Sequence, residues 1–114
     1  MNNITKTRYA IFQILLEVFK KNKNFDTALN KVIFKYNFNQ KDISFINNVC
    51  LNTMRRSIHI KIILKKYVKS KLKINEFTLL SSALSQILYL NIKHYAVVNE
   101  TVNVAKKLMC LQDL

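Results

Sequence analysis

The side chains most often used in catalysis are few in this chain and far apart. His59 and His94 are separated by 35 positions, and neither has an acidic residue at a spacing that would bring it close. The six acidic residues are scattered, and no two of them have the helical spacing expected of an acid–base pair. The sequence therefore predicts no catalytic residue, and we expect the chain not to act as an enzyme by itself.

Metal and cofactor sites lack their usual motifs as well. Cys50 and Cys110 are 60 positions apart among apolar neighbours, without the Cys or Cys/His spacing of a zinc site. We expect both to be buried, reduced thiols. The chain contains no glycine, so neither a phosphate-binding P-loop nor the methyl-donor site of a Rossmann-like domain can be built from the usual motif. We therefore predict no metal and no cofactor.

Cationic side chains are the chemistry that the sequence does supply. The chain has 19 Lys and Arg residues against six acidic ones, which gives a formal net charge of +13. A charge of this size attracts phosphate polymers over long range. A/T-rich codons explain part of the lysine content, since Asn, Ile and Tyr are also frequent while Gly and Pro are absent. Such a codon bias does not remove Asp and Glu to the same degree, so a functional basic surface is the better explanation.

Three groups of cations could contact the phosphates of a nucleic acid. Lys6 and Arg8 precede the first apolar stripe, although an ordinary solvated N-terminus could carry the same residues. Arg55 and Arg56 follow the third stripe, where they would also complement the helix dipole, typically by about 0.3–1 kcal/mol. The third and densest group lies on and just after the fourth helix and consists of Lys61, Lys65, Lys66, Lys69, Lys71 and Lys73. Because lysine lacks the bidentate fork of arginine, we expect affinity for a phosphate backbone with little sequence preference.

Helices are expected to position these residues, because apolar residues recur at the 3.6-residue period along the chain. Without Gly or Pro, helix ends are read from Ser57 as an N-cap and from asparagine, which tolerates the left-handed conformation. The dividing asparagines are Asn22, Asn24, Asn37, Asn39, Asn75 and Asn91. The pattern predicts an all-α bundle of about six helices, at residues 7–21, 25–36, 41–55, 58–70, 76–90 and 95–109. We expect one domain over residues 1–114, because this length holds a single core.

The fourth and fifth helices have different faces. In the fourth, we expect Ile60, Ile63, Leu64 and Tyr67 to point inward and the lysines to point outward. Binding to a membrane surface would need an exposed apolar stripe beside those lysines, and we expect the core to cover that stripe, so we predict no membrane role. The fifth helix is apolar nearly all round and is expected to be the central, most buried helix.

The sixth helix has a wide apolar face that needs cover from more than one neighbour. This face comprises Val97, Val98, Val102, Val104, Ala105, Leu108 and Met109. An apolar patch left open there would serve a protein partner or self-association. No apolar run reaches 18 residues and the N-terminus lacks a signal-peptide pattern, so we expect a cytoplasmic protein.

Several short motifs occur in an order that is more specific than any one of them. They are Arg8 followed by Ile14-Leu15-Leu16-Glu17-Val18, then Ala28-Leu29-Asn30, Asp42-x-x-Phe45-Ile46 with Arg55, Gln86-Ile87-Leu88-Tyr89, and Ala96-Val97-x-Asn99-Glu100 leading to Ala105-Lys106. Together they resemble the NusB-like RNA-binding domain over most of the chain. Asn52, Ala83 and Lys93 stand where the family has Gly, Gly and Pro. Nothing after Lys107 resembles the family's last helix, so the chain either lacks it or is the front part of a longer protein.

The resemblance implies a NusB-like helical bundle that binds RNA, most simply ribosomal RNA, and that can also contact a protein. Two branches of the superfamily fit. The first motifs resemble the N-terminal domain of the 16S rRNA cytosine-5 methyltransferases more than the second branch, the NusB transcription antitermination factors. The first branch would make this chain an rRNA-binding domain without the catalytic domain. The second would make it a regulator of transcription that acts through protein and RNA contacts, with basic residues such as Lys6 and Arg8 on the RNA.

Overall fold

Six α-helices account for the chain in the computed structural model, which describes residues 1–112, and no strand occurs among those residues. The helices are α1 (Asn3–Lys21), α2 (Phe25–Lys35), α3 (Gln40–Arg55), α4 (Ser57–Tyr67), α5 (Ile74–Leu88) and α6 (His94–Gln112). The all-α prediction and the number of helices are confirmed. The predicted single domain extends to residue 114, two residues beyond the described part.

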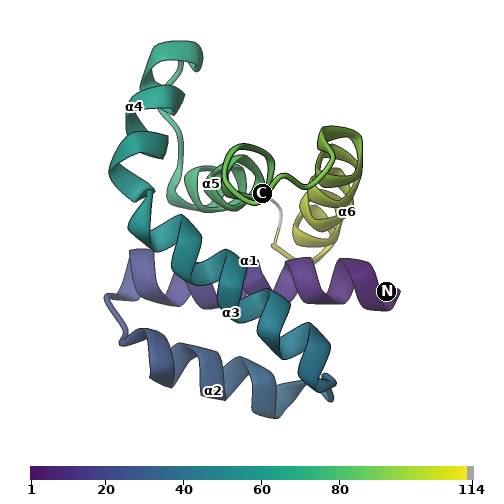
Figure 1. Ribbon diagram of the computed structural model, residues 1–114. Coiled ribbons are helices and arrows are strands. Elements are labelled where there is room, and N and C mark those ends of the chain that lie inside the picture. Colours follow the sequence, from purple (N-terminus) through teal and green to yellow (C-terminus); the bar gives the residue numbers. More distant parts are fainter. Residues whose placement is uncertain (113–114) are drawn as a thin grey trace.

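Helix α1 is the centre of the bundle. It contacts α2, α3, α5 and α6, and Figure 1 shows α2 below it, α5 and α6 above it, and α3 crossing it diagonally. Its fully or almost fully buried side chains include Ile11, Phe12, Ile14 and Leu15. The prediction that the fifth helix is the most buried one is therefore wrong, because α1 supplies more buried apolar residues than any other helix, whereas α5 supplies only Ala83.

The buried face of α5 is made of small and polar residues. Its buried positions are Thr78, Ser81, Ser82, Ala83, Ser85 and Gln86. Leu79 and Leu84 are only partly buried, and Leu88 is exposed. Small side chains let two helices approach closely, so α5 can pack tightly through this face while its leucines spread over the flanks. Several of these polar groups bond back within the helix, as the Thr78 hydroxyl does to the Ile74 carbonyl at 2.7 Å.

Asparagine ends two helices where other proteins use glycine. Asn22 after α1 and Asn91 after α5 both have φ of 55°, the left-handed conformation. In each case the next residue closes the helix end: Lys23 N–H donates to the Glu17 carbonyl at 3.1 Å, and Ile92 N–H donates to the Gln86 carbonyl at 3.0 Å. The predicted use of asparagine at breaks is confirmed at these two positions. Asn75, by contrast, lies in the first turn of α5.

Asparagine also starts helices. The side chain of Asn2 accepts from Thr5 N–H at 2.9 Å, which starts α1 four residues earlier than predicted. Asn24 and Asn39 cap α2 and α3 in the same way. Ser57 does not act as an N-cap, contrary to the prediction. The chain turns from α3 into α4 at Arg56, whose carbonyl accepts from Ile60 N–H at 2.9 Å, so Ser57 is already helical.

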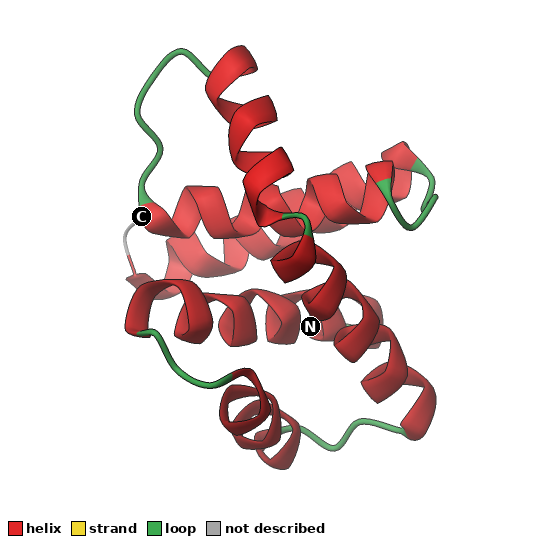
Figure 2. Cartoon of the chain, turned by 60° about the vertical axis from the view of Figure 1, so that its left-hand side comes forward, coloured by secondary structure: helices red, strands yellow, loops and turns green. Residues whose placement is uncertain are grey.

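Helix α4 stands out from the body of the bundle. Figures 1 and 2 show it rising away from the other helices, with a loop returning from its end to α5. It packs on α5 and on the end of α3, through Ile60 and Leu64. Tyr67 is 72% exposed, Ile58 is 75% exposed and Ile62 is 60% exposed. The prediction that Tyr67 points into the core is wrong, because α4 ends at this residue instead of at 70 and its last turn extends past its neighbours.

Helix α6 is covered on one side only. Val97, Val104 and Leu108 are buried, whereas Val98, Val102 and Met109 are between 45% and 60% exposed. The wide apolar face was predicted correctly, and only part of it has a neighbour in the described chain. Cys110 is exposed, against the prediction of two buried thiols, because it lies on a different face of α6 from the buried Leu108; Cys50 is buried in the core.

Candidate nucleic-acid interface

The densest group of cations lies on the projecting part of the molecule. We call α4 and the segment 68–73 the basic arm. Its lysines are all exposed, and they are Lys61, Lys65, Lys66, Lys69, Lys71 and Lys73. No acidic residue occurs between Asp42 and Glu76, and Arg55 and Arg56 lie at the base of the arm. This part of the surface therefore presents eight cations in sequence without a compensating charge.

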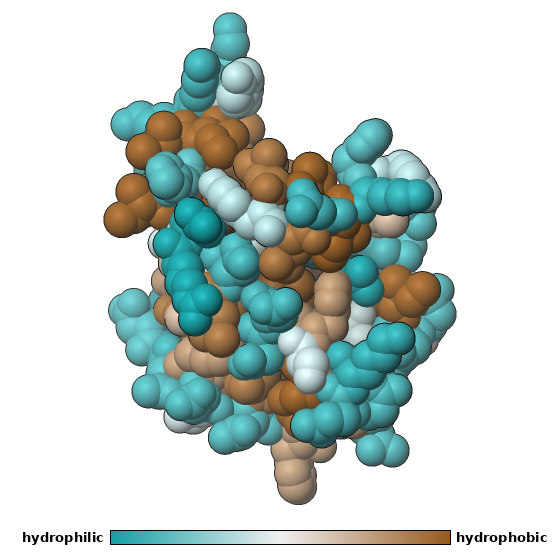
Figure 3. All heavy atoms as spheres, in the orientation of Figure 1, coloured by the Kyte–Doolittle hydropathy of each residue, from teal (hydrophilic) through white to brown (hydrophobic). Residues whose placement is uncertain are grey.

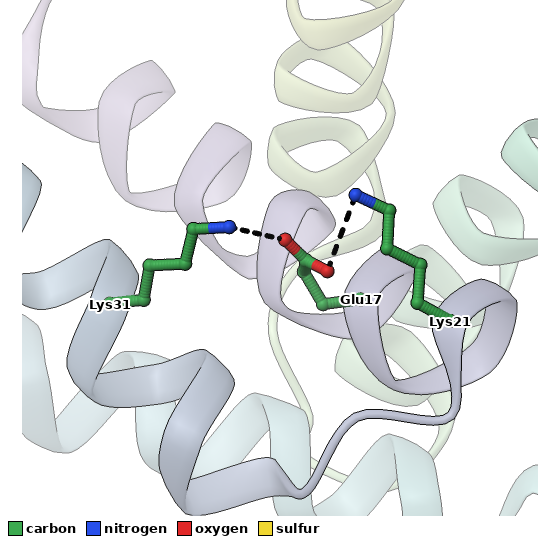
Figure 4. A network of polar contacts seen from close by, with 3 residues as sticks. All are labelled: Glu17, Lys21 and Lys31. Carbon is green, nitrogen blue, oxygen red and sulfur yellow. Dashed lines mark hydrogen bonds and ion pairs between the residues drawn. The ribbon is translucent and has the colours of Figure 1, made fainter.

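Two lysines outside the arm, Lys21 and Lys31, are paired with a carboxylate. Figure 4 shows the carboxylate of Glu17 on α1 between Lys31 of α2 and Lys21, at N–O distances of 2.9 and 3.6 Å. The hydrogen bond from Lys31, followed by the attraction of the neighbouring lysines, holds the pKa of Glu17 below its usual value. Within residues 1–112, these are the two ion pairs, so the arm's lysines take part in none.

A groove runs between α4 and α5 along the arm. Its larger compartment has a volume of about 720 Å³ and its floor is apolar, formed by Leu64, Val68, Leu72 and Phe77. Its rim carries Lys61, Lys65, Lys69 and Lys71. A second compartment of about 460 Å³ continues toward Phe19 and Ser57 and shares Lys61, Leu72 and Phe77 with the first. Figure 3 shows apolar and hydrophilic atoms side by side over this upper part of the molecule.

Phe77 is the aromatic residue at the junction of the two compartments. Its ring centroid lies 5.9 Å from that of Phe19, and the Lys61 ammonium lies 5.9 Å from the same ring. The loop that forms one wall alternates apolar or small residues with lysines, from Val68 to Lys73. We did not predict Phe77 or Leu72 as surface residues. The alternation in this loop is a signal of extended backbone that could have indicated Leu72.

Arg55 and Arg56 lie where α3 passes into α4. Both are exposed, and the Arg56 guanidinium carbon lies 4.7 Å from the centre of the Tyr89 ring at the end of α5. This contact is a cation–π interaction that helps to fix the base of the arm. The structure thus brings the second and third groups of predicted cations together on one side of the molecule.

Lys6 and Arg8 lie near the other end of α1. Arg8 is eleven positions from Phe19, roughly 16 Å at 1.5 Å per helical residue. Its guanidinium carbon lies 4.4 Å from the centre of the Phe45 ring, and one of its nitrogens donates to the Thr7 hydroxyl at 3.2 Å. Burial lowers the pKa of Arg8, while Glu100 and Asp42 act in the opposite direction. The Lys6 ammonium lies 5.5 Å from the centre of the Phe38 ring. The structure does not bring this group together with the arm.

Other kinds of site find little support in the described residues. Residues 1–112 contain no group of three His, Cys, Asp or Glu side chains that could hold a metal ion. Burial raises the pKa of the Cys50 thiol. None of the helices in this range combines the length and the apolar character needed to cross a bilayer.

Comparison with known proteins identifies the family. The model of the NusB family matches residues 5–112. No curated protein and no solved structure matches the chain. A NusB domain is an RNA-binding module, and the all-α bundle of this chain agrees with that fold. Because the family model spans nearly all of its residues, this chain belongs to the NusB family.

Proposed function

We propose that the chain binds RNA through the basic arm and the two arginines at its base. The observation that carries the proposal is the run of eight cations from Arg55 to Lys73 without one acidic residue, on a part of the molecule that projects into solvent. Phosphates are spaced regularly along a nucleic-acid strand, so an exposed helix with lysines on successive turns can contact several at once.

The chemistry of the arm favours backbone binding over base reading by hydrogen bonds. Its six helical and loop cations are all lysines, which act as point charges, and only Arg55 and Arg56 could make bidentate contacts. Arg56 is already engaged with Tyr89. Affinity should therefore depend strongly on salt and weakly on sequence.

We assign Lys6 and Arg8 to a secondary contact. The Arg8 guanidinium packs on Phe45 and is influenced by the charges of Asp42 and Glu100, so its first role is to join α1 to α3. Lys6 is partly exposed beside it. A long RNA that lies along α1 could reach this pair after contacting the arm.

As the finer assignment, we propose ribosomal RNA as the ligand and a cytosine-5 methyltransferase domain as the recipient of the bound RNA. Support comes from the motifs of the first three helices, which resemble the domain that precedes such enzymes. The 114 residues contain no glycine and so lack the usual glycine-rich motif of a methyl-donor site. In this proposal the chain acts in the cytoplasm and presents RNA without altering it.

The second candidate is a transcription antitermination factor that combines RNA binding with a protein contact. The exposed face of α6 favours it, since Tyr95, Val98, Val102 and Met109 are 64%, 53%, 45% and 60% exposed and follow one another along the helix. Exposed apolar stripes of this kind commonly serve protein contacts or self-association. Light scattering of the purified chain with and without rRNA fragments separates the two: an RNA-free dimer favours this second candidate.

Charge reversal on the arm tests RNA binding directly. Replacing Lys65, Lys66 and Lys69 together with Glu should lower the affinity for an rRNA fragment at least a hundredfold in a filter-binding assay. All three side chains are exposed, so the circular dichroism of the helices should not change.

The matched control reverses three exposed lysines outside the arm, Lys20, Lys23 and Lys41, which changes the net charge by the same amount. We expect this variant to lose much less affinity, through the long-range field alone. Equal losses in the two variants would show that RNA responds only to total charge, and would remove the arm as the binding site.

A further inference from the structure

The groove along the arm has a composition that phosphate binding alone does not explain. We propose that this groove receives unpaired bases of an RNA loop or single strand, while the lysines on its rim hold the adjacent phosphates. This inference rests on the proposed RNA binding. The arm would then distinguish unpaired from paired RNA, although it reads no particular sequence.

The shape of the groove suits flat rings. Its two compartments, of about 720 and 460 Å³, lie within the size range of small-molecule sites, and they meet at Lys61, Leu72 and Phe77. Two neighbouring bases could occupy one compartment each. The lysines on the rim favour an anionic strand as the occupant over a docked helix of this protein's own basic composition.

The floor of the groove suits stacking. Phe77 is partly exposed at the junction, and the Leu64, Val68 and Leu72 side chains surround it with apolar surface. Bases stack on aromatic rings without regard to sequence, because every base has a π face. The Lys61 ammonium lies over the Phe77 ring, 5.9 Å from its centre, and this exposed side chain must move aside for a base to stack on that face.

The rim suits the backbone of the same strand. Lys61 and Lys65 lie on successive turns of α4, about 6 Å apart along its axis, and Lys69 and Lys71 continue the line on the loop. None of the residues lining the two compartments is acidic. The nearest carboxylate in sequence, that of Glu76, accepts a hydrogen bond from Lys73 N–H at 2.8 Å and caps α5.

The test uses three RNAs of equal length and compares their affinities by fluorescence anisotropy: an unpaired oligouridine, the same strand with abasic sites in place of its central bases, and a duplex. The full chain should bind the oligouridine about tenfold more tightly than the abasic strand or the duplex. Phe77→Leu should abolish this preference and keep the weaker, charge-driven binding to all three. Phe34→Leu is the matched control, because Phe34 is 94% exposed on α2, outside the groove, and should leave the preference intact.

A second variant covers the case in which Phe77→Leu unfolds the chain. Leu72→Glu changes a loop residue shared by both compartments and places a carboxylate in the groove, so it should weaken binding of the oligouridine more than binding of the duplex. Equal affinity of the full chain for all three RNAs would overturn the groove proposal and leave RNA binding by the arm standing. Absence of binding to any RNA would overturn the proposed function itself. An acidic amphipathic peptide that binds the groove without displacing the oligouridine would also contradict the proposal.

Discussion

Arg8 and Lys61 both lie beside an aromatic ring, yet their surroundings give them different roles. The Arg8 guanidinium is partly buried against Phe45, and the charges of Asp42 and Glu100 act on it. Lys61 is exposed at the edge of a groove that no acidic residue lines. A cation that is already surrounded contributes to stability, whereas a solvated one is available to a ligand.

Truncation of Arg8 should therefore affect folding more than binding. We expect Arg8→Ala to lower the free energy of unfolding by about 1–2 kcal/mol, since it removes a partly desolvated cation–π contact and its packing. Urea denaturation followed by circular dichroism measures this loss. Arg55→Ala removes an exposed arginine that contributes mainly its charge at the end of α3, so it should cost less, about 0.3–1 kcal/mol. An Arg8→Ala variant that is fully stable and yet unable to bind RNA would reverse the assignment.

The sequence identified the residues of the arm because charge is visible in composition, and all six lysines are indeed exposed. It did not indicate Phe77 or Leu72, which belong to apolar patterns that normally mark a core. Whether such a residue ends up inside or at a groove depends on how far the neighbouring helix extends over it. That distance depends on how the helices pack together, and it cannot be predicted from the apolar pattern of one helix.

At the scale of the elements, asparagine replaces glycine as the residue that ends helices. Asn22 and Asn91 adopt φ of 55° and are followed by the hydrogen bonds that close α1 and α5. Their side chains are small and polar, which makes the left-handed conformation less costly than for other non-glycine residues. This is how a chain without glycine still changes direction tightly between α5 and α6.

Substitution at Asn91 measures that effect. Asn91→Ala should lower the free energy of unfolding by about 1 kcal/mol, because alanine in the left-handed conformation brings its Cβ close to the following carbonyl. Asn91→Gly should leave stability unchanged or slightly raise it. Thermal unfolding of the two variants provides the comparison. Equal melting temperatures for the alanine and glycine variants would contradict this explanation, because they would show that a Cβ atom at position 91 costs no stability.

Helix periodicity located all six helices but ranked their burial incorrectly. The leucine-rich α5 is less buried than α1, because its small residues Ser81, Ser82 and Ser85 form the face that packs. Hydrophobicity summed around a helix predicts burial only if the largest side chains face inward. In α4 the same reasoning failed for Tyr67. This residue lies on the apolar face of the helix, but at the end of α4 no other helix covers that face, and Tyr67 is exposed.

At the scale of the whole molecule, the charge of +13 is not spread evenly. Asp42 and Glu100 lie with Arg8 near the start of α1, and Glu17 pairs with two lysines where α1 meets α2. The arm has no acidic residue of its own and follows the end of α3, the opposite end of that helix from Asp42. The resulting field should orient an approaching RNA toward the arm before any contact forms.

The most direct test of this account is the salt dependence of RNA binding in the unmodified chain and in a variant with Lys65, Lys66 and Lys69 changed to Gln. If these side chains bind phosphates of an unpaired strand, the slope of log K against log salt should fall in magnitude by about 2, because each neutralised phosphate contributes about 0.7 to the slope. The circular dichroism spectrum should stay the same. An unchanged slope, with affinity and helicity also unchanged, would show that RNA does not bind at the basic arm.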